Sequence, residues 1–281
     1  MVTKLEQVAQ NKAFGGSITK YKFVSEALGG LETHFNLFVP EGASSSAKVP
    51  VVTYLAGLTC NEDTAPWKSG LLLPASQHSL ALLFPDTSPR GAQIATEDDS
   101  WDFGTGAGFY LNATASDWSK NYNMEKLITS EIQQALKDNT EVGGVLDLDR
   151  QSVMGHSMGG HGAITLYLKG LLGSREGVQY KAASGFAPIL NPTKCPWGEK
   201  AFKGYLKVCH PTSNRQNANL RRASWKKARP TMRLSSLPRP RERTCRFLPT
   251  MVRPITFTRL GSFCLRILWR SPRMLGLGLI R

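Results

Sequence analysis

The chain has few cysteines and no long apolar run. Its five cysteines show no C-x-x-C pair, so neither a disulfide framework nor a zinc site is predicted. No apolar run approaches the length of a membrane span, and no opening stretch has the pattern of a secretory signal. We therefore expect a cytoplasmic protein with reduced thiols, and we expect neither a metal site nor a membrane partner.

Acidic residues are scarce in only one part of the chain. Residues 1–205 hold 17 Lys and Arg against 20 Asp and Glu, whereas residues 206–281 hold 18 against one. The net charge of +14 therefore arises in the last quarter. That quarter has seven prolines, few aromatic residues and no known binding motif, so nucleic acid is not expected as a partner. We predict a globular domain at residues 1–205 and an irregular basic tail at residues 206–281.

The first part of the chain has the pattern of an α/β domain. Residues 18–24 and 33–39 predict an antiparallel hairpin. Apolar spacing predicts a helix at 124–136. Buried strands are predicted at residues 51–56, 80–84 and 150–154, and a further strand is predicted at residues 180–186. Because strands alternate with helices, we expect a mainly parallel central sheet with helices on both faces.

The run GHSMG at residues 155–159 fits the G-x-S-x-G nucleophile elbow. In this motif a serine lies on a sharp turn between a strand and a helix, and only glycine fits where the two backbones pass closely. A serine-capped turn without chemistry would share the bare motif. The strand before Ser157 and the apolar helix predicted at residues 158–172 favour the catalytic interpretation. At the start of that helix, the Met158 N–H would point free toward an oxyanion at Ser157.

Two other segments are candidates for the site. The turn at residues 57–63 follows an early central strand, where a second oxyanion donor is expected, and we assign that role to the Leu58 N–H. Residues 88–120 form a long loop rich in Gly, Asp and aromatics, including Trp101. A loop of this length is usually functional, so we predict a wall of the substrate pocket; a surface insertion is the alternative.

Five sequence blocks resemble the S-formylglutathione hydrolase family, also called esterase D. They are LAGLTCNED (55–63), FPDTSPRG (84–91), GTGAGFYLNAT (104–114), MGHSMGGHG (154–162) and PILNPTKCPWG (188–198). They occur in the family's order, and the resemblance extends from about residue 12 to Tyr205. It implies an α/β-hydrolase fold and a serine thioesterase that hydrolyses S-formylglutathione to formate and glutathione in formaldehyde detoxification. Broader activity on small acyl esters is implied as well.

The resemblance also implies roles for individual residues. Ser157 matches the nucleophile, while Leu58 and Met158 match the backbone donors of the oxyanion hole. Cys60 matches a family cysteine beside the active site, and His156 belongs to the elbow block, where we expect it to support the turn. Near-site positions are completed by Trp101 and Trp197. The family works without a cofactor on a small-molecule substrate, in the cytoplasm and often as a homodimer.

The remaining triad members are not found in this sequence. The family places an aspartate and then a histidine after the serine. No aspartate follows Asp149 here, so an acid and a base could come only from Glu176 or Glu199 with His210. His210 follows Ser157 too soon to allow the intervening strands. We therefore predict impaired hydrolysis. Because the last strands and helices would be missing or replaced, we also predict an unpaired sheet edge and low stability.

Three interpretations of the tail remain open. An arginine pair and a lysine pair on either side of Trp225 are compatible with a native basic binding module. A divergent splice form is the second, and out-of-frame translation, which we favour, is the third. The corresponding alternative function is a catalytically inactive hydrolase-fold isoform whose tail binds a partner. An acyltransferase of the same fold is the nearest enzymatic alternative.

Overall fold

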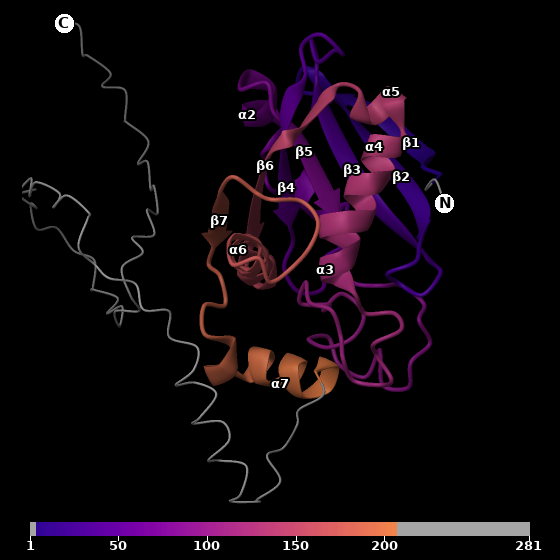
Figure 1. Ribbon diagram of the computed structural model, residues 1–281, viewed down its shortest axis with the longest axis vertical. Helices are drawn as coiled ribbons and strands as arrows, with labels where there is room; N and C mark the ends of the chain where they lie inside the picture. The colour runs from indigo at the N-terminus through magenta and orange to yellow at the C-terminus, as the bar shows by residue number, and fades with distance from the viewer. Residues whose placement is uncertain (1–3, 207–281) are drawn as a thin grey trace, which may run out of the picture. The chain divides into compact units, whose positions relative to one another are not determined.

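A computed structural model describes residues 4–206, and the predictions made for the tail lie outside these residues. Within this part, seven strands form one sheet in the order β1-β2-β3-β5-β4-β6-β7 (Figure 1). The strands are β1 (Glu6–Ala13), β2 (Gly16–Ser25), β3 (Leu31–Pro40), β4 (Val49–Leu55), β5 (Ala81–Pro85), β6 (Leu146–His156) and β7 (Ala183–Phe186).

The sheet is mixed. Strands β1, β2, β3 and β5 pair antiparallel, whereas β5, β4, β6 and β7 pair parallel. The hairpin predicted from residues 18–24 and 33–39 is confirmed as β2 and β3, which pair in register from Gly16 with Pro40 to Ser25 with Leu31. The parallel half carries the elbow, because β6 leads directly into it.

Burial explains why the central strands could be predicted from the sequence. All five residues of β5 are buried, and β4 alternates buried with half-buried positions. A strand covered on both faces needs apolar residues along its whole length, as β5 has. Each of the four predicted strands overlaps an observed one, although β6 begins earlier than predicted, at Leu146, and β7 is mostly exposed.

Helices lie on both faces of the sheet. They are α1 (Thr64–Lys68), α2 (Leu72–Gln77), α3 (Met124–Lys126), the π-helical turn η1 (Leu127–Glu131), α4 (Ile132–Asp138), α5 (Thr140–Gly143), α6 (Met158–Leu171), the 3₁₀ turn η2 (Pro192–Lys194) and α7 (Pro196–Tyr205). The helix predicted at residues 124–136 is thus α3, η1 and α4 in succession. None of the helices in the described part is long and apolar enough to cross a membrane.

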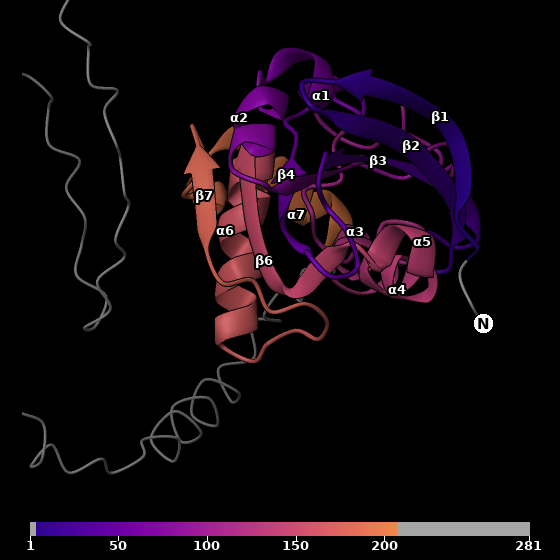
Figure 2. The ribbon, with the colours of Figure 1, turned by 90° about the horizontal axis from the view of Figure 1, so that it is seen from above.

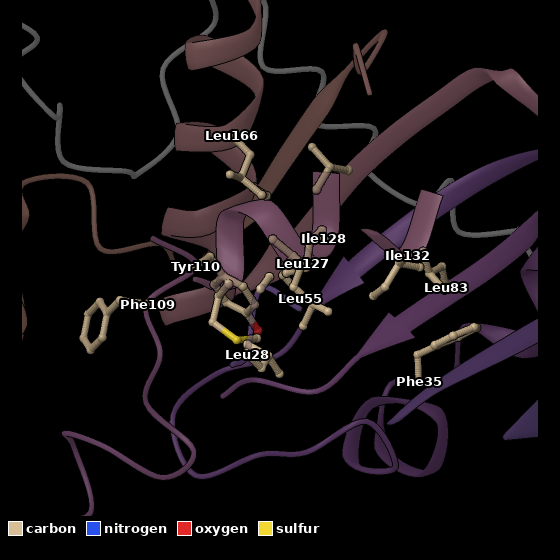
Figure 3. Close-up of a cluster of buried hydrophobic side chains, with 14 of the residues drawn as sticks. Leu28, Phe35, Leu55, Leu83, Phe109, Tyr110, Leu127, Ile128, Ile132 and Leu166 are labelled. Carbon is tan, nitrogen blue, oxygen red and sulfur yellow. The ribbon is translucent and has the colours of Figure 1, made fainter. Parts of the chain in front are cut away.

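Two apolar clusters fill the two sides of the sheet. The larger joins β4 and β5 to η1, α4 and α6; its members include Leu55, Leu83, Ile128, Ile132 and Leu166, which converge in Figure 3. The smaller lies on the opposite face, where α1 and α2 pack on Phe38, Leu82 and Phe84. Figure 2 shows α2 and α4 on opposite sides of the strands. The predicted arrangement of helices on both faces is confirmed.

Strand β7 forms one edge of this sheet. Within residues 4–206 it pairs with β6 and with no further strand. Its Phe186 side chain is 52% exposed. A strand edge that has no partner among the described residues, and that carries an exposed aromatic residue, is a site where a further strand can pair.

Candidate active site

Ser157 lies at the sharp turn between β6 and α6. Its backbone has φ 56° and ψ −118°, a conformation that costs a residue with a side chain about 1–3 kcal/mol. The turn is held in place because the Ser157 N–H donates to the Phe186 carbonyl at 2.9 Å and the His161 N–H donates to the Ser157 carbonyl at 3.0 Å. The predicted turn geometry around the serine is therefore present.

Two glycines make this turn possible. A Cβ at Gly159 would lie 1.9 Å from the Leu55 carbonyl oxygen, and a Cβ at Gly155 would lie 2.3 Å from the Gly159 carbonyl oxygen. Both contacts are far inside van der Waals distance. The start of α6 therefore rests directly on the backbone of β4, as the spacing of the motif predicts.

The turn after β4 lies beside Ser157. A Cβ at Gly57 would be 3.4 Å from the Ser157 Cβ, so the two backbones are in contact distance. Within residues 4–206, neither the Leu58 nor the Met158 N–H donates to a protein acceptor. Two free N–H groups next to a serine hydroxyl can stabilise the oxyanion of a tetrahedral intermediate. Their assignment as an oxyanion hole stays a prediction.

The long loop fixes a carbonyl and an amide group of this turn. The Tyr110 hydroxyl donates to the Ala56 carbonyl at 2.7 Å, and the Thr59 N–H donates to the Gly106 carbonyl at 2.9 Å. Thr59 itself adopts a positive φ of 65°. The strained turn therefore depends on the long loop for its shape.

An ion pair after β5 holds the same turn as well. The Arg90 guanidinium donates to the Cys60 carbonyl at 3.0 Å and to both carboxylate oxygens of Asp86, at 2.9 and 2.6 Å. Burial by itself lowers the pKa of Arg90, but its bonds to Asp86 raise it overall. Sequence reasoning did not assign these residues to the site, although both lie in the block at 84–91.

The two elbow histidines differ in their surroundings. His156 is exposed at the end of β6, whereas His161 is half-buried with its Nδ1 3.1 Å from the Ile189 carbonyl oxygen. Burial lowers the pKa of His161, more than its hydrogen bond raises it. Among the described residues, no histidine hydrogen-bonds to the Ser157 hydroxyl. His161 instead ties α6 to the segment after β7.

The other predicted near-site residues fall into two places. Cys60 is half-buried in the turn beside Ser157. Trp101 and Trp197 contact each other, with ring centroids 6.4 Å apart at 72°, and are 60% and 42% exposed. They join the long loop to α7, which lies next to it below the sheet in Figure 1. Their role in binding a substrate stays a prediction.

Polar contacts strengthen this junction between the long loop and α7. Lys200 donates to the Ser100 hydroxyl at 2.6 Å and forms an ion pair with Asp102. The hydrogen bonds from Lys200 and Ser100 lower the pKa of Asp102. Sequence reasoning missed Lys200, because its partners lie about 100 residues earlier in the chain.

Comparison with known proteins agrees with this architecture. The family model Esterase matches residues 25–244. The S-formylglutathione hydrolase of Arabidopsis thaliana is 47% identical over 206 residues, which is 73% of this chain and 69% of that protein. The enzyme of the same name from Rattus norvegicus is 46% identical over 203 residues, covering 72% of this chain and 68% of the relative.

A solved structure gives the same result. The S-formylglutathione hydrolase from Agrobacterium tumefaciens superimposes with a TM-score of 0.65 at 39% identity, covering 72% of this chain and 69% of that one. The resemblance inferred from the five sequence blocks is thereby confirmed, and so is the α/β-hydrolase fold. The chain belongs to the S-formylglutathione hydrolase family of serine esterases.

Proposed function

We propose that Ser157 is the nucleophile of a thioesterase site whose oxyanion hole is formed by the Leu58 and Met158 N–H groups. The observation that carries this proposal is the strained backbone of Ser157, φ 56° and ψ −118°, beside two N–H groups that have no acceptor within the described residues. Strain of this kind persists where the surrounding structure requires it, and it is concentrated at active sites.

The proposed substrate is S-formylglutathione, because the relatives compared above carry that name. The Ser157 oxygen attacks the thioester carbonyl carbon and passes its proton to solvent water, and the resulting oxyanion faces Leu58 and Met158. Cleavage of the carbon–sulfur bond releases the glutathione thiolate, which takes up a proton from water, and leaves a formyl ester on Ser157. Water then hydrolyses this ester to formate and restores the hydroxyl. A thiolate leaves readily, so oxyanion stabilisation accounts for most of the lowered barrier.

We further propose that turnover by this chain is slow. No aspartate follows Asp149 in the sequence, and His210 is the single histidine after His161. Loss of one triad member costs about 10⁴-fold in a serine protease, while the oxyanion hole and substrate binding retain about 10³–10⁴-fold over water. Residues 1–205 would thus form the hydrolase domain, and residues 206–281 a basic tail that supplies no acid–base pair.

The test uses the full chain and two measurements. Formate and free thiol released from S-formylglutathione give the turnover rate. Mass spectrometry after incubation with 4-nitrophenyl acetate shows whether a serine is acetylated. We expect slow turnover and one acetyl group on the peptide that contains Ser157. Ser157→Ala should abolish both, whereas Ser184→Ala, a change at an exposed serine of β7, should alter neither.

Two results would overturn parts of this proposal. Equal acetylation of the parent and Ser157→Ala would remove Ser157 as the nucleophile. Turnover near the median of about 10 s⁻¹ for enzymes, abolished by Ser157→Ala, would refute the proposed impairment and show that another base acts. A chain that folds and is not acetylated would favour the alternative of an inactive isoform with a binding tail.

A further inference from the structure

Tyr205, the last residue of α7, is completely buried against the long loop. Its ring stacks on Phe103, with centroids 4.3 Å apart, and on Tyr122, at 5.2 Å. The indole of Trp118 meets it edge-on at 5.1 Å. The four aromatic residues form one cluster between α7 and the loop. This cluster is absent from the assigned site, and the mechanism above does not use it.

The Tyr205 hydroxyl clamps one tight turn of the loop. It accepts a hydrogen bond from the Gly104 N–H at 2.7 Å and donates one to the Ala107 carbonyl at 3.0 Å. The Ala107 N–H in turn donates to the Gly104 carbonyl at 3.0 Å and closes the turn. One side-chain oxygen thus joins both ends of the 104–107 turn. Burial raises the pKa of Tyr205, so its hydroxyl keeps the proton that it donates.

The middle of the same turn contacts the proposed oxyanion hole. The Gly106 carbonyl accepts from the Thr59 N–H at 2.9 Å, and a Cβ at Gly106 would lie 3.1 Å from the Thr59 Cα. On its other side, the Gly106 N–H donates to the Ser88 hydroxyl at 2.8 Å. Thr59 follows Leu58 directly. Any shift of Gly106 is therefore passed to the peptide between Leu58 and Thr59, which adjoins the peptide that carries the Leu58 N–H.

We propose that Tyr205 is a positioning residue for the oxyanion hole, acting through the 104–107 turn and Thr59; its catalytic meaning rests on the proposed function of Leu58. The hydroxyl sets the turn, the turn sets the Thr59 amide, and the Thr59 amide fixes the orientation of the neighbouring Leu58 N–H. Tyr205 does not touch the reacting atoms. Helix α7 thus contributes to the site although it supplies no catalytic group.

Tyr205→Phe and Tyr122→Phe form a matched pair. Each change removes one hydroxyl from the same aromatic cluster and keeps the ring. The Tyr122 hydroxyl donates to the buried Glu97 carboxylate at 2.6 Å and makes no bond of its own to the 104–107 turn, which Glu97 contacts only through its backbone carbonyl, by a 3.3 Å bond from the Thr105 N–H. Loss of a donor to a buried carboxylate destabilises at least as much as loss of a neutral pair. Tyr122→Phe therefore reports the effect of general destabilisation.

The first measurement is amide hydrogen exchange of peptides that cover residues 57–60. Without the clamp, opening of the turn exposes the Thr59 amide more often, and its exchange should rise about tenfold in Tyr205→Phe. In Tyr122→Phe it should stay within about twofold of the parent. Equal exchange in the parent and Tyr205→Phe overturns the proposal, as does the same increase in both variants. This measurement does not depend on any activity.

The second measurement tests the catalytic consequence. In single-turnover acetylation of Ser157 by 4-nitrophenyl acetate, the rate constant at saturation should fall about tenfold in Tyr205→Phe, while the half-saturating concentration stays unchanged. The carbonyl stretch of the acetyl-enzyme should move to higher wavenumber, since the hydrogen bonds to it weaken. Faster Thr59 exchange without any acetylation of the parent would refute the function of Ser157 and leave the positioning intact. If Tyr205→Phe exchanges the Thr59 amide faster but keeps the acetylation rate and the carbonyl stretch of the parent, then the position of the turn does not affect stabilisation of the oxyanion, and that part of the proposal is refuted.

Discussion

Alanine at Gly159 should damage the elbow more than alanine at any neighbouring glycine. The new Cβ would lie 1.9 Å from the carbonyl oxygen and 2.4 Å from the carbonyl carbon of Leu55, and 2.6 Å from the Ala56 carbonyl oxygen. All three atoms belong to the backbone of β4 and its following turn. No side-chain rotation can relieve the overlap, so α6 must move away from the sheet.

The size of the effect follows from two opposing contributions. Overpacking costs about 1–3 kcal/mol, and we take the upper limit because backbone must shift. Alanine in a helix gains about 1 kcal/mol over glycine. The net loss is then about 2 kcal/mol, which for a domain of this size lowers the melting temperature by about 4–8 °C. Ser157 acetylation should fall with it, since the helix start carries the Met158 N–H.

Gly160→Ala is the matched control for this prediction. Its Cβ would lie 3.0 Å from the Pro188 Cβ and 3.1 Å from the Gly155 carbonyl oxygen, contacts that a shift of a few tenths of an ångström relieves. The helical gain offsets this cost, so the melting temperature should change by less than about 2 °C. Thermal unfolding followed by tryptophan fluorescence distinguishes the variants. Equal melting temperatures for Gly159→Ala and the parent would refute the steric argument.

Two further predictions concern charged groups around the elbow. Asp86→Ala should lower the free energy of unfolding, measured in urea, by about 2–3 kcal/mol. This is less than the usual cost of breaking a buried pair, because the Arg90 side chain is 37% exposed. Adding Arg90→Gln should restore part of the lost stability, and a loss below about 1 kcal/mol in Asp86→Ala would contradict the prediction. Burial lowers the pKa of His161 in the folded state, so the unfolded chain takes up a proton first as the pH falls below about 6.5. The free energy of unfolding should therefore be constant above that pH and decline below it. His161→Asn should remove this decline, and the control His78→Asn should not. An unchanged decline in His161→Asn would exclude His161 as its source.

The elements found from the sequence are those whose pattern is local. The hairpin of β2 and β3, the buried β5 and the glycine spacing around Ser157 each reflect a constraint among residues near one another in the chain. Glycines 155 and 159 are required by close backbone contacts, and the motif reports that requirement directly. The elbow geometry was therefore predictable to the residue.

The missed elements have patterns that are weak or non-local. Strand β1 is exposed along seven of its eight residues and pairs with β2 through its backbone, so no apolar alternation indicates it. Helix α7 begins with Pro196 and includes two glycines, which weakens its helical signal. The position of β5 between β3 and β4 and the bond from Tyr205 to Gly104, 101 residues apart, depend on the folded arrangement. The periodic spacing of apolar residues carries no information about contacts between residues so far apart in the sequence.

The aromatic cluster around Tyr205 can form only late in synthesis, because its parts leave the ribosome at different times. Gly104 leaves the ribosome 101 residues before its partner Tyr205. At about 5–20 residues per second, the long loop waits on the order of 5–20 s for α7. During that interval Phe103 and Trp118 lack the ring that covers them. The nascent chain therefore exposes an aromatic surface until α7 emerges, and a chaperone that binds such surfaces has a defined period in which to act.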